Sequence, residues 1–455
     1  FIDDNSSKVG KKIEGIRIYS KAGFEGLIQK YDVDSLIISI QNLSREKKDE
    51  IVDMALKFRV QVLNVPAASS WVNGELSYRQ IQKVKIEDLL GREEIKLDER
   101  NIKEQLYQKT VLVTGAAGSI GSEIARQVAS YSPGRLVLLD QAESPLYDLQ
   151  LEIDESYGSN FAEVVVGDVR SEYRMRQVYE TFNPEIVYHA AAYKHVPMME
   201  ENPSEAVRTN ILGTKVCVDL ADEFGVDKFV FISTDKAVNP TNVMGASKRV
   251  AEMYAQSKNA TSDTKYITTR FGNVLGSNGS VIPLFKRQIE KGGPITVTHP
   301  EITRYFMTIP EACQLVLEAG KMGSGGEVYI FDMGPSVKIA DLAKKMVRLS
   351  GLELGKDIHI KYVGLRPGEK LFEELLADAE NNLATHHPQI MIGSVPQYPH
   401  EEVSRSVQDL CDSHTKFNNP SLVKKIKKLV PEYKSKNSIY EKLDKKESSK
   451  KAIQS

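Results

Sequence analysis

Residues 110–121 read Thr-Val-Leu-Val-Thr-Gly-Ala-Ala-Gly-Ser-Ile-Gly, and this stretch decides the fold of the chain. An apolar run of strand length leads directly into Gly115, Gly118 and Gly121, and a helical pattern follows. Such glycines permit a tight turn, a close approach of the backbone to a pyrophosphate, and close packing of the helix on the strand. The free N–H groups and the positive end of the helix dipole then bind the phosphates. The stretch therefore predicts a dinucleotide-binding α/β domain.

The same alternation continues after this stretch, where apolar runs of strand length are separated by segments of helix length. This pattern is typical of a doubly wound parallel sheet. Five further strands are expected, at residues 135–140, 162–167, 185–190, 228–233 and 266–270.

The strand at 135–140, the second of the sheet when 110–114 is counted, ends at Asp140, about 20 residues beyond the glycines. A carboxylate at this place binds the ribose diol of an adenine nucleotide and repels a 2′-phosphate, which favours NAD over NADP. The alternative is that Asp140 only caps the following helix. Asp168, after the third strand, is expected either to bond the adenine amine or to cap a helix.

Periodicity and composition divide the whole chain into five parts. We expect a small N-terminal α/β domain, a connector, a Rossmann-type NAD-binding domain, a smaller substrate-binding portion and a Lys-rich tail. The tail is expected to be solvated, with a surface-binding arm as the alternative. The boundaries are placed at residues 1–66, 67–108, 109–275, 276–433 and 434–455.

Within the N-terminal part, short apolar runs alternate with helical patterns, which predicts a small parallel sheet. The expected strands are 15–19, 35–40 and 60–64, and the expected helices are 22–31 and 44–58.

Composition excludes several classes of protein. The chain has 455 residues, of which 41% are hydrophobic, as is typical of soluble globular proteins. The formal net charge of −2 argues against a sequence-independent grip on nucleic acid. Cys217, Cys313 and Cys411 follow no metal-ligand spacing, so no metal site is expected. No apolar run has the length of a membrane span, although the start Phe-Ile-Asp-Asp-Asn indicates a soluble fragment whose parent protein can carry membrane helices upstream.

A second group of polar residues follows the strand at 228–233. The sequence Ser233-Thr-Asp-Lys236 lies at a carboxyl edge where ligands bind in such folds, and Met244-Gly-Ala-Ser-Lys248 comes soon after it. An adjacent Asp and Lys supply a proton donor and a proton acceptor. Neighbouring opposite charges favour ionisation of both groups, so a solvated ion pair is the alternative. Their position opposite the glycine loop favours a role in catalysis.

These motifs resemble the extended short-chain dehydrogenase/reductase superfamily, and within it the long-form UDP-N-acetylglucosamine 4,6-dehydratase family of bacterial glycan and capsule biosynthesis. The resemblance covers about residues 80 to 400. Besides the glycine loop and Ser233–Lys248, it rests on residues 189–196 (His-Ala-Ala-Ala-Tyr-Lys-His-Val), 210–214 (Asn-Ile-Leu-Gly-Thr), 270–276 (Arg-Phe-Gly-Asn-Val-Leu-Gly), 303–307 (Thr-Arg-Tyr-Phe-Met) and 366–370 (Arg-Pro-Gly-Glu-Lys).

The resemblance implies a redox-neutral dehydration. NAD takes hydride from C4 of the sugar, water is lost across C5 and C6, and hydride returns to C6, which yields UDP-4-keto-6-deoxy-N-acetylglucosamine. Following the family, Asp235 is the acid at C6 and Lys236 the base at C5, with Thr234 and Lys248 also assigned to catalysis. The acid role requires a protonated Asp235 and hence a raised pKa in a closed site.

The remaining site residues are assigned partly from the resemblance. Arg304 and Arg366 are expected to contact the diphosphate, because a guanidinium matches phosphate oxygens, or else to form surface ion pairs. His189 is expected in the core or pocket. The NAD site is expected to comprise Gly115, Ala117, Gly118, Ser119, Ile120, Gly121, Asp140, Asp168, Val169, Ala190, Ala192, Lys194, Asn210, Ser233 and Lys248, and the substrate site Lys194, His195, Asp235, Lys236, Met244, Asn273, Arg304, Arg366 and Glu369.

One residue departs from the superfamily pattern. Its dehydrogenases carry a Tyr four residues before the lysine, where this chain has Met244. A thioether transfers no proton, so Asp235, Lys236, Thr234 or Tyr193 must accept the proton of the C4 hydroxyl. The long forms resemble this chain in having Met there. The rival interpretations are an NAD-dependent 4-epimerase, which normally needs the missing tyrosine, and a noncatalytic NAD- or UDP-sugar-binding protein.

The resemblance also implies a homo-oligomer without a nucleic-acid partner. For the full-length protein it implies a place at the cytoplasmic face of the bacterial inner membrane. The C5 stereochemistry of the product and the downstream pathway stay open.

Overall fold

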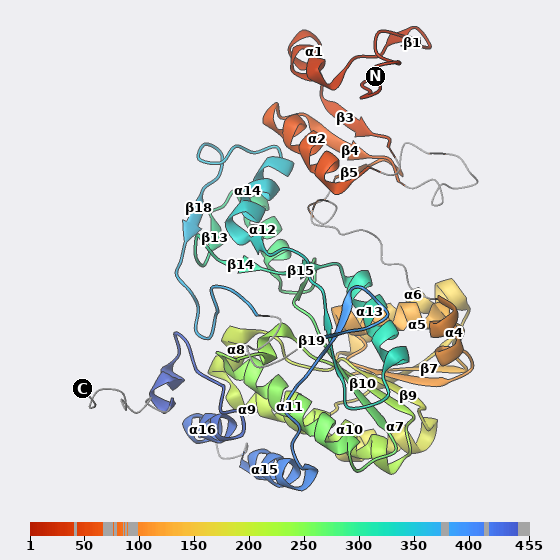
Figure 1. Cartoon of the computed structure of the whole chain (residues 1–455), viewed down its shortest axis with the longest axis vertical. Coiled ribbons are helices and arrows are strands. Elements are labelled where there is room, and N and C mark those ends of the chain that lie inside the picture. The colour runs from red at the N-terminus through yellow and green to blue at the C-terminus, as the bar shows by residue number, and fades with distance from the viewer. Residues whose placement is uncertain are drawn as a thin grey trace. The chain divides into compact units, whose positions relative to one another are not determined.

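The computed structural model describes residues 1–40, 43–66, 99–374, 382–413 and 418–444, together with positions 76, 80–84, 86 and 89 (Figure 1). The chain forms two compact units. Unit 1 comprises Phe1–Arg92, Phe285–Ile295 and Asp341–Lys361, and unit 2 comprises Glu93–Leu284, Thr296–Ala340 and Tyr362–Ser455. Of the expected connector at 67–108, most residues before 99 lie outside the described residues. Its described part includes β5 (Gln82–Lys83), which pairs with β4 (Gln61–Asn64), and α4 (Glu99–Leu106).

A nine-stranded sheet organises unit 2, with strand order β19-β20-β16-β11-β10-β9-β6-β7-β8. The strands from β8 to β16 are parallel, and β20 and β19 are added antiparallel at one edge. Chain order reverses between β6 and β9, which is where ligands bind in doubly wound folds. The six expected strands are confirmed to within one residue at either end. The bounds are β6 Thr110–Thr114, β7 Arg135–Asp140, β8 Ala162–Val166, β9 Ile186–His189, β10 Lys228–Ile232, β11 Lys265–Arg270, β16 Val328–Phe331, β19 Asn382–Ala384 and β20 Ile390–Gly393.

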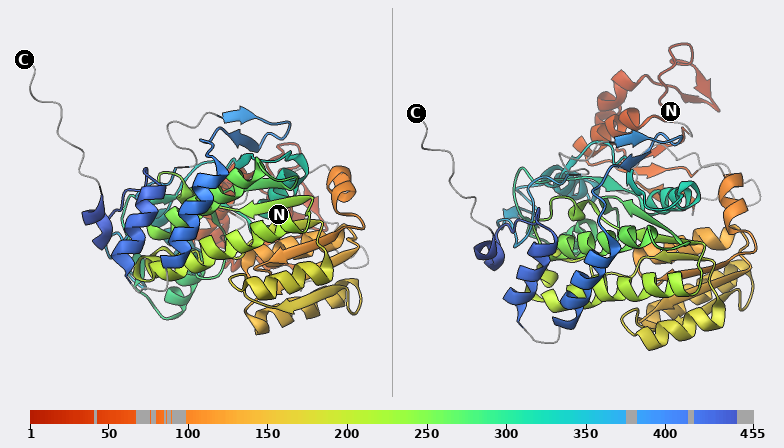
Figure 2. Two further views of the ribbon diagram at one scale, coloured as in Figure 1. Left: turned by 90° about the horizontal axis from the view of Figure 1, so that it is seen from below. Right: turned by 60° about the horizontal axis from the view of Figure 1, so that its bottom comes forward.

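Helices cover both faces of this sheet, as the views in Figure 2 show. Side chains alternate along β6, so that Val111 and Val113 enter one hydrophobic cluster and Leu112 enters the other. The first cluster includes residues of α4, α5 (Ser119–Ser130), α6 (Glu143–Tyr157) and α13 (Ile309–Met322). The second includes residues of α7 (Glu172–Phe182), α10 (Thr214–Glu223), α11 (Val243–Asn259), α15 (His400–Ser413) and α16 (Asn419–Leu429).

Local capping explains where two of these helices begin. The Asn242 side chain accepts a hydrogen bond from the Gly245 N–H, which fixes the first turn of α11. Thr308 and Glu311 form a reciprocal capping box at the start of α13.

Short elements complete the described part of the chain. In unit 2 they include α8 (Val196–Glu201), α9 (Pro203–Ala206), a π-helix (Val207–Gly213), a 3₁₀ turn (Asp235–Ala237), β12 (Asn273–Val274), β14 (Thr303–Arg304), β15 (Phe306–Met307) and β17 (Val337–Lys338). The boundaries between the units fall within or beside α12 (Val281–Glu290), β13 (Ile295–Val297), α14 (Ile339–Leu349) and β18 (Ile360–Tyr362).

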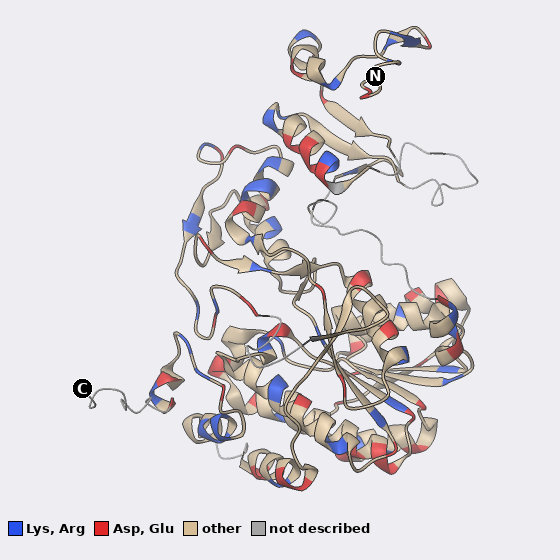
Figure 3. Cartoon of the chain, viewed as in Figure 1, with Lys and Arg blue, Asp and Glu red and all other residues tan. Residues whose placement is uncertain are grey.

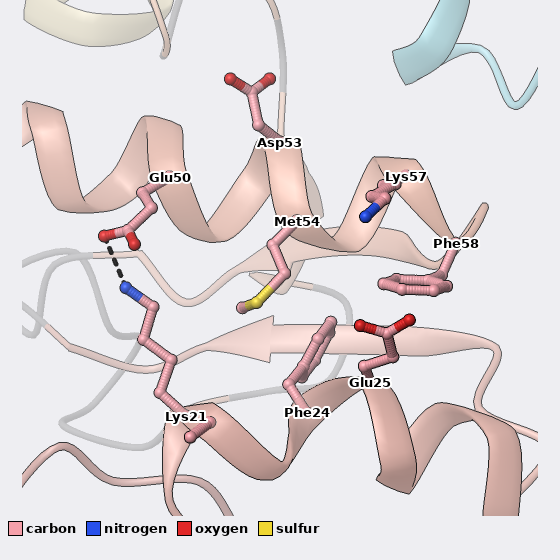
Figure 4. A pocket seen from close by; sticks show the side chains of 9 residues that line it. Lys21, Phe24, Glu25, Glu50, Asp53, Met54, Lys57 and Phe58 are labelled. Atoms are coloured by element: carbon pink, nitrogen blue, oxygen red, sulfur yellow. Dashed lines mark ion pairs between the residues drawn. The ribbon is translucent and has the colours of Figure 1, made fainter.

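Unit 1 contains a three-stranded sheet of order β3-β4-β5, in which only β3 and β4 are parallel. The strand expected at 15–19 was predicted to join the parallel sheet, and this pairing is wrong. Within that range β2 forms, and it pairs antiparallel with β1 in a separate hairpin. A cavity of about 720 Å³ lies between α1 and α2, where Phe24, Met54 and Phe58 point toward one another and a Lys21–Glu50 ion pair stands at one side (Figure 4). The bounds are β1 Lys12–Ile13, β2 Ile16–Arg17, 3₁₀ helix Lys21–Gly23, α1 Phe24–Lys30, β3 Ser35–Ile38, α2 Arg45–Lys57, β4 Gln61–Asn64 and β5 Gln82–Lys83.

Residues 434–444 do not form the solvated tail that lysine content predicts. They include a 3₁₀ helix, Ile439–Leu443, and the Tyr440 side chain is buried in the core of unit 2. The Gly368 N–H donates to the Lys436 carbonyl at 2.7 Å, and the Lys436 N–H donates to the Thr241 carbonyl at 3.2 Å. We call residues 434–444 the C-terminal strap. Residues 445–455 of the expected tail lie outside the described residues.

Lys and Arg are interspersed with Asp and Glu along the helices of unit 2 (Figure 3). This distribution agrees with the near-zero net charge of the sequence. Within the described part of the chain, every helix is too short or too polar to cross a membrane.

Candidate active site

The glycine loop joins β6 to α5 at the point where the strand order reverses. Gly115 has φ +69°, and a Cβ there would lie 2.5 Å from the Ala191 nitrogen. A Cβ on Gly121 would lie 2.1 Å from the Gly115 carbonyl oxygen. Side chains at either position would fill the cradle, so the loop keeps its phosphate-binding form only with glycine. It lies beside the predicted cofactor residues Ala190 and Ala192, which follow β9.

Asp140 lies at the end of β7, beside the same loop. One carboxylate oxygen accepts the N–H of Ala117 at 3.0 Å, and the other accepts the N–H of Ala142 at 2.9 Å. The second contact closes a turn ahead of α6 and is not a helix cap, because the N-cap of α6 is Ala142 and no side chain caps it. The first contact brings the carboxylate to the glycine loop. The ribose contact of Asp140 therefore stays a prediction that this position supports.

Asp168 and Val169 follow β8 and have partners within the protein. Arg170 donates to Asp168 through Nε at 2.7 Å and through its backbone N–H at 2.9 Å. Burial would raise the pKa of Asp168, but these bonds outweigh it, and the pKa lies below its usual range. Val169 packs against Gly213, where an added Cβ would lie 2.8 Å from its Cγ2. An adenine contact by Asp168 must therefore coexist with Arg170.

Three expected pocket residues are committed to the interior. His189 is held between the hydroxyls of Thr114 at 2.7 Å and Thr214 at 3.0 Å, and burial together with nearby Lys248 lowers its pKa to about 3. The prediction of a core histidine is therefore confirmed. Two residues assigned to the NAD site, Asn210 and Ser233, form hydrogen bonds with other protein groups through their side chains.

Asn210 clamps the backbone that follows β9. Its amide accepts the Tyr193 N–H at 2.8 Å and donates to the Tyr193 carbonyl at 3.0 Å and to the Ser247 hydroxyl at 2.9 Å. Because both donors and the acceptor are engaged, Asn210 positions the segment 190–194, and its cofactor contact stays a prediction. Ser233 likewise donates its hydroxyl to buried Glu252 at 2.6 Å, and its cofactor contact also stays a prediction.

The Thr234–Lys236 turn follows β10 at the carboxyl edge of the sheet. Lys236 Nζ donates to Asp235 Oδ1 at 2.9 Å and to Asn273 Oδ1 at 3.1 Å. The Thr234 hydroxyl donates to the same Asp235 oxygen at 2.8 Å. Asp235 is buried, and its second oxygen, Oδ2, has no hydrogen-bond partner among the described residues. This oxygen is enclosed next to Gly272, where an added Cβ would lie 3.1 Å from it.

The start of α11 holds this turn in place. A Cβ on Gly245 would lie 2.1 Å from the Lys236 carbonyl oxygen, so only glycine allows the helix to approach so closely. Met244 is buried in the core cluster, and Lys248 lies one turn further along the same helix face. Sequence analysis missed Gly245, although its place between Met244 and Ala246 at a helix start was the available signal.

Lys248 lies under the sheet edge with its ammonium group enclosed. Nζ donates to the Ile232 carbonyl at 2.6 Å and lies 3.9 Å from the centre of the Phe231 ring. Burial lowers the pKa of Lys248 to about 7, although the Glu252 charge opposes that shift. A lysine in this state can donate to a ribose hydroxyl and exchange its proton near neutral pH.

The charge of Lys236 depends on its burial and on the carboxylates beside it. Burial would lower the pKa of Lys236, but Asp235 and Glu373 outweigh it and raise that pKa. Lys236 is therefore an ammonium at neutral pH, paired with the Asp235 carboxylate. The roles expected from the family require a proton to move from Lys236 to Asp235 first.

The segment 366–374 brings further charges to the same edge. Arg304 contacts Glu369 at 3.4 Å and the Lys370 carbonyl at 2.9 Å, and Arg366 lies 3.5 Å from Glu369 with half of its side chain exposed. The expected diphosphate and ribose contacts of these residues are untested, and Arg366 is the freer of the two arginines.

Lys194 and His195 stand at the exposed rim of the site. Burial and the charge of Lys236 lower the pKa of Lys194, which brings these two lysines into the same electrostatic environment. His195 packs against Gly279, where an added Cβ would lie 2.5 Å from the ring. Both positions suit a substrate that covers the edge of the sheet.

Sequence analysis also missed Glu373, a buried carboxylate 3.8 Å from Lys236 Nζ and 3.6 Å from Arg304 Nε. Its only sequence signal is its position shortly after the Arg-Pro-Gly-Glu-Lys motif.

Comparison with known proteins places these residues in a family. Residues 111–395 match the family model described as polysaccharide biosynthesis protein. The chain is 50% identical over 392 residues to the capsular polysaccharide biosynthesis protein CapD of Staphylococcus aureus, covering 86% of this chain and 65% of that relative. It is 34% identical over 280 residues to an inverting UDP-N-acetylglucosamine 4,6-dehydratase of Campylobacter jejuni. It is 35% identical over 280 residues to a UDP-glucose 4-epimerase of Rickettsia canadensis; each alignment covers 60% of this chain and 79% of the relative.

Solved structures agree with the observed sheet order. Pen from Bacillus thuringiensis has a TM-score of 0.59 at 36% identity, over 64% of this chain and 89% of that chain. DesIV, a dTDP-glucose 4,6-dehydratase from Streptomyces venezuelae with NAD and TYD bound, has a TM-score of 0.53 at 20% identity, over 68% and 99%. This second likeness concerns the fold alone. Because the family match includes the glycine loop, the Thr234–Lys236 turn and the segment 366–374, the chain belongs to the polysaccharide biosynthesis protein family, within the extended short-chain dehydrogenase/reductase superfamily.

Proposed function

We propose that this chain catalyses the NAD-dependent 4,6-dehydration of UDP-N-acetylglucosamine to UDP-4-keto-6-deoxy-N-acetylglucosamine, for bacterial glycan or capsule biosynthesis. The observation that carries this proposal is the Asp235–Lys236 pair, with one buried and unpartnered carboxylate oxygen at the carboxyl edge of β10. Loss of water from C5 and C6 needs an acid and a base side by side. A 4-epimerase has no use for an acid at C6.

The cofactor would lie along the glycine loop, with its phosphates against the start of α5 and its adenosine ribose against Asp140. Lys248 would bond the nicotinamide ribose, because its Nζ lies at the edge of β10 near the Thr234–Lys236 turn. When bound, NAD accepts hydride from C4 and returns it to C6, so no cofactor is consumed overall.

The chain's own residues supply the proton chemistry. Transfer of one proton from Lys236 Nζ to Asp235 Oδ1, over 2.9 Å, converts the ion pair into an amine and a carboxylic acid. The amine then removes the C5 proton, and the acid protonates the C6 hydroxyl as water leaves. After water leaves, Lys236 is an ammonium and Asp235 a carboxylate. Lys236 would then give a proton to C5 as hydride returns to C6, and uptake of one proton, equal to the one that the C4 hydroxyl released, would restore the resting pair.

The proton of the C4 hydroxyl needs another acceptor, because Met244 occupies the place of the tyrosine. Thr234 is suited to receive this proton at its hydroxyl oxygen and pass its own proton on, since that hydroxyl lies in the same turn and donates to Asp235 Oδ1 at 2.8 Å. Met244 serves instead as an apolar wall at the start of α11.

The substrate would cover the carboxyl edge, with Asn273 on the sugar, Arg366 and Arg304 on the diphosphate, and Glu369 on the uridine ribose. Lys194 and His195 would close the rim. Two relatives at similar identity carry the names dehydratase and epimerase, so the names of relatives do not decide the reaction.

Incubation of the purified chain with UDP-N-acetylglucosamine, followed by mass spectrometry of the nucleotide sugar, tests the proposal. Loss of the mass of one water supports dehydration. A new isomer of unchanged mass would establish epimerisation instead, and an unaltered sugar would leave a binding protein. Denatured protein should release NAD, and accumulation of reduced cofactor equal to product would contradict a closed redox cycle.

The chain spans 65% of the length of the Staphylococcus aureus relative, so the parent protein's properties are also proposals. We propose a homo-oligomer, held at the cytoplasmic face of the inner membrane by segments outside this sequence.

A further inference from the structure

Glu373 is a buried carboxylate that the mechanism above does not use. Its side chain is 3% exposed, with Oε1 at 3.8 Å from Lys236 Nζ and 3.6 Å from Arg304 Nε. Oε2 has no hydrogen-bond partner among the described residues. Burying a carboxylate is costly unless hydrogen bonds and opposite charges compensate it closely.

Another buried carboxylate in the same unit shows what close compensation looks like. Glu252 accepts hydrogen bonds from Ser233 at 2.6 Å, from Arg270 at 2.7 and 2.8 Å, and from Arg249 at 3.1 Å. Among the described residues, the nearest cations to Glu373 lie at 3.6 and 3.8 Å, and its second oxygen has no partner. A carboxylate kept buried with so little compensation points to a function at the site it faces.

We propose that Glu373 is a positioning residue for the dehydration, whose negative charge holds the Lys236 ammonium against Asp235 Oδ1 and strengthens Lys236 as the base at C5. This inference rests on the proposed function. The charged groups facing Lys236 are Asp235 from its own turn, Glu373 and Arg304 from the segments at 366–374 and 303–304, and Lys194 from the rim.

The charges explain why one carboxylate is insufficient. Arg304 and Lys194 are cations near Lys236, and each disfavours a second positive charge. Asp235 alone must oppose both, and it loses its charge when it accepts the proton. Glu373 keeps its charge through that step, because the transfer breaks an N–H bond of Lys236 and forms an O–H bond on Asp235. The amine is therefore still beside an anion when it takes the C5 proton.

The pH dependence of turnover tests this role. Activity requires one proton within the Asp235–Lys236 pair, so it falls at alkaline pH when Lys236 loses that proton. Glu373→Gln keeps the shape but removes the charge, and the alkaline limb of the kcat profile should move to lower pH. Turnover at the optimum should fall ~10–100-fold, with a smaller change in KM. Glu373→Asp, which restores the charge, should return the limb toward its original position.

Glu374→Gln provides the matched control. Its carboxylate is the next along the chain, is partly exposed, and bonds Asn239 at 2.7 Å and Lys370 at 3.5 Å. The same change of charge there should leave the alkaline limb in place. Circular dichroism of each variant verifies the fold.

A second measurement does not depend on turnover. Competitive acetylation of Lys236 over a range of pH, read by mass spectrometry on NAD-loaded protein without substrate, reports the proton affinity of its amine. In Glu373→Gln, Lys236 should become reactive at lower pH than in the wild type. An unchanged Lys236 titration and an unchanged alkaline limb would overturn the inference. If the wild type fails to dehydrate UDP-N-acetylglucosamine, the proposed function fails, and the acetylation result still decides whether Glu373 acts on Lys236.

Discussion

Unit 1 and unit 2 both contain parallel strands flanked by helices, yet they differ in where their charged side chains lie. Among the described residues, every buried charged side chain belongs to unit 2, including Asp235, Lys248, Glu252 and Arg270. The cavity of unit 1 has an apolar floor of Phe24, Met54 and Phe58 with charges only at its rim (Figure 4). Burial perturbs proton affinity, and perturbed groups gather where chemistry occurs. The comparison therefore assigns proton chemistry to unit 2.

The largest effect is expected at the Asp235–Lys236 pair. Asp235→Asn and Lys236→Ala should each lower turnover by ~10²–10⁴-fold, because each removes one partner of general acid–base catalysis. Met244→Leu, which keeps the volume, should change turnover far less. The readout is the mass of the nucleotide-sugar product, and a loss with Met244→Leu as large as with the other two would place the proton chemistry elsewhere in unit 2.

Asp235→Asn and Lys236→Ala should also distinguish the role of the acid from that of the base. Asp235→Asn leaves oxidation at C4 possible, so reduced cofactor should accumulate on adding substrate. Lys236→Ala should also stop exchange of the C5 proton with heavy water. Normal exchange in Lys236→Ala would reject the lysine as base and make Asp235 the leading candidate.

The next effect concerns the buried ion-pair network behind the site. Glu252→Gln should lower the free energy of unfolding by ~3–5 kcal/mol, because it leaves the Arg270 and Arg249 charges buried without their partner. Urea unfolding measures this, with Glu223→Gln on the surface as the control. A stability loss no larger than that of the control would remove the contrast between buried and exposed charges.

The Glu252 network also predicts a pH dependence of stability. Burial would raise the pKa of Glu252, but Arg270, Arg249 and Ser233 lower it to about 2. A carboxylate with a lowered folded pKa stabilises the protein above its unfolded pKa, and this contribution disappears as the pH falls toward 2. About 3 kcal/mol should be lost across that interval, and the loss should be absent in Glu252→Gln.

A smaller effect is expected at the cofactor edge of unit 2. Asp140→Ala should weaken NAD binding by ~10–100-fold, because it removes a charged acceptor for the ribose and a support of the loop at Ala117. Isothermal titration of cofactor-free protein with NAD provides the measurement. Unchanged affinity would leave Asp140 only as a support of the turn before α6.

The smallest effect is expected in unit 1. Lys21→Ala breaks a partly exposed ion pair with Glu50 and should cost less than ~1 kcal/mol of stability, without changing turnover. Thermal unfolding measures the loss of stability, and the dehydration assay measures turnover. A marked loss of turnover would mean that unit 1 contributes to the chemistry, which the comparison denies.

Much of the fold could be predicted because strand order follows from strong local patterns. The run from Thr110 to Gly121 specifies a strand, a turn and a helix through steric rules that act within a few residues. The strand expected at 15–19 was misplaced because its length and apolarity say nothing about its partner. The C-terminal strap was missed because lysine content conceals Tyr440, whose burial depends on contacts with distant segments.

The site could be predicted only where a motif carries it. Asp235 and Lys236 were found because they follow a strand at the carboxyl edge. Ser233 and Asn210 occupy the same stretches, but their side chains turn toward Glu252 and Tyr193, a choice that tertiary packing makes. Glu373 lies more than a hundred residues after Lys236 in the sequence, and local sequence patterns do not predict a contact between such distant residues.

The C-terminal strap has a consequence for how the site assembles during synthesis. The strands and the glycine loop of unit 2 precede it in the chain, so this sheet can form while later residues are still being translated. The Arg366–Lys370 segment gains its main-chain partner at Gly368 only after Lys436 has left the ribosome. Ser438 then bonds Glu200, which in turn accepts the first N–H of α11 at Val243. A growing chain would therefore acquire its dinucleotide fold early and its substrate edge late, which delays catalysis until the strap has been synthesised.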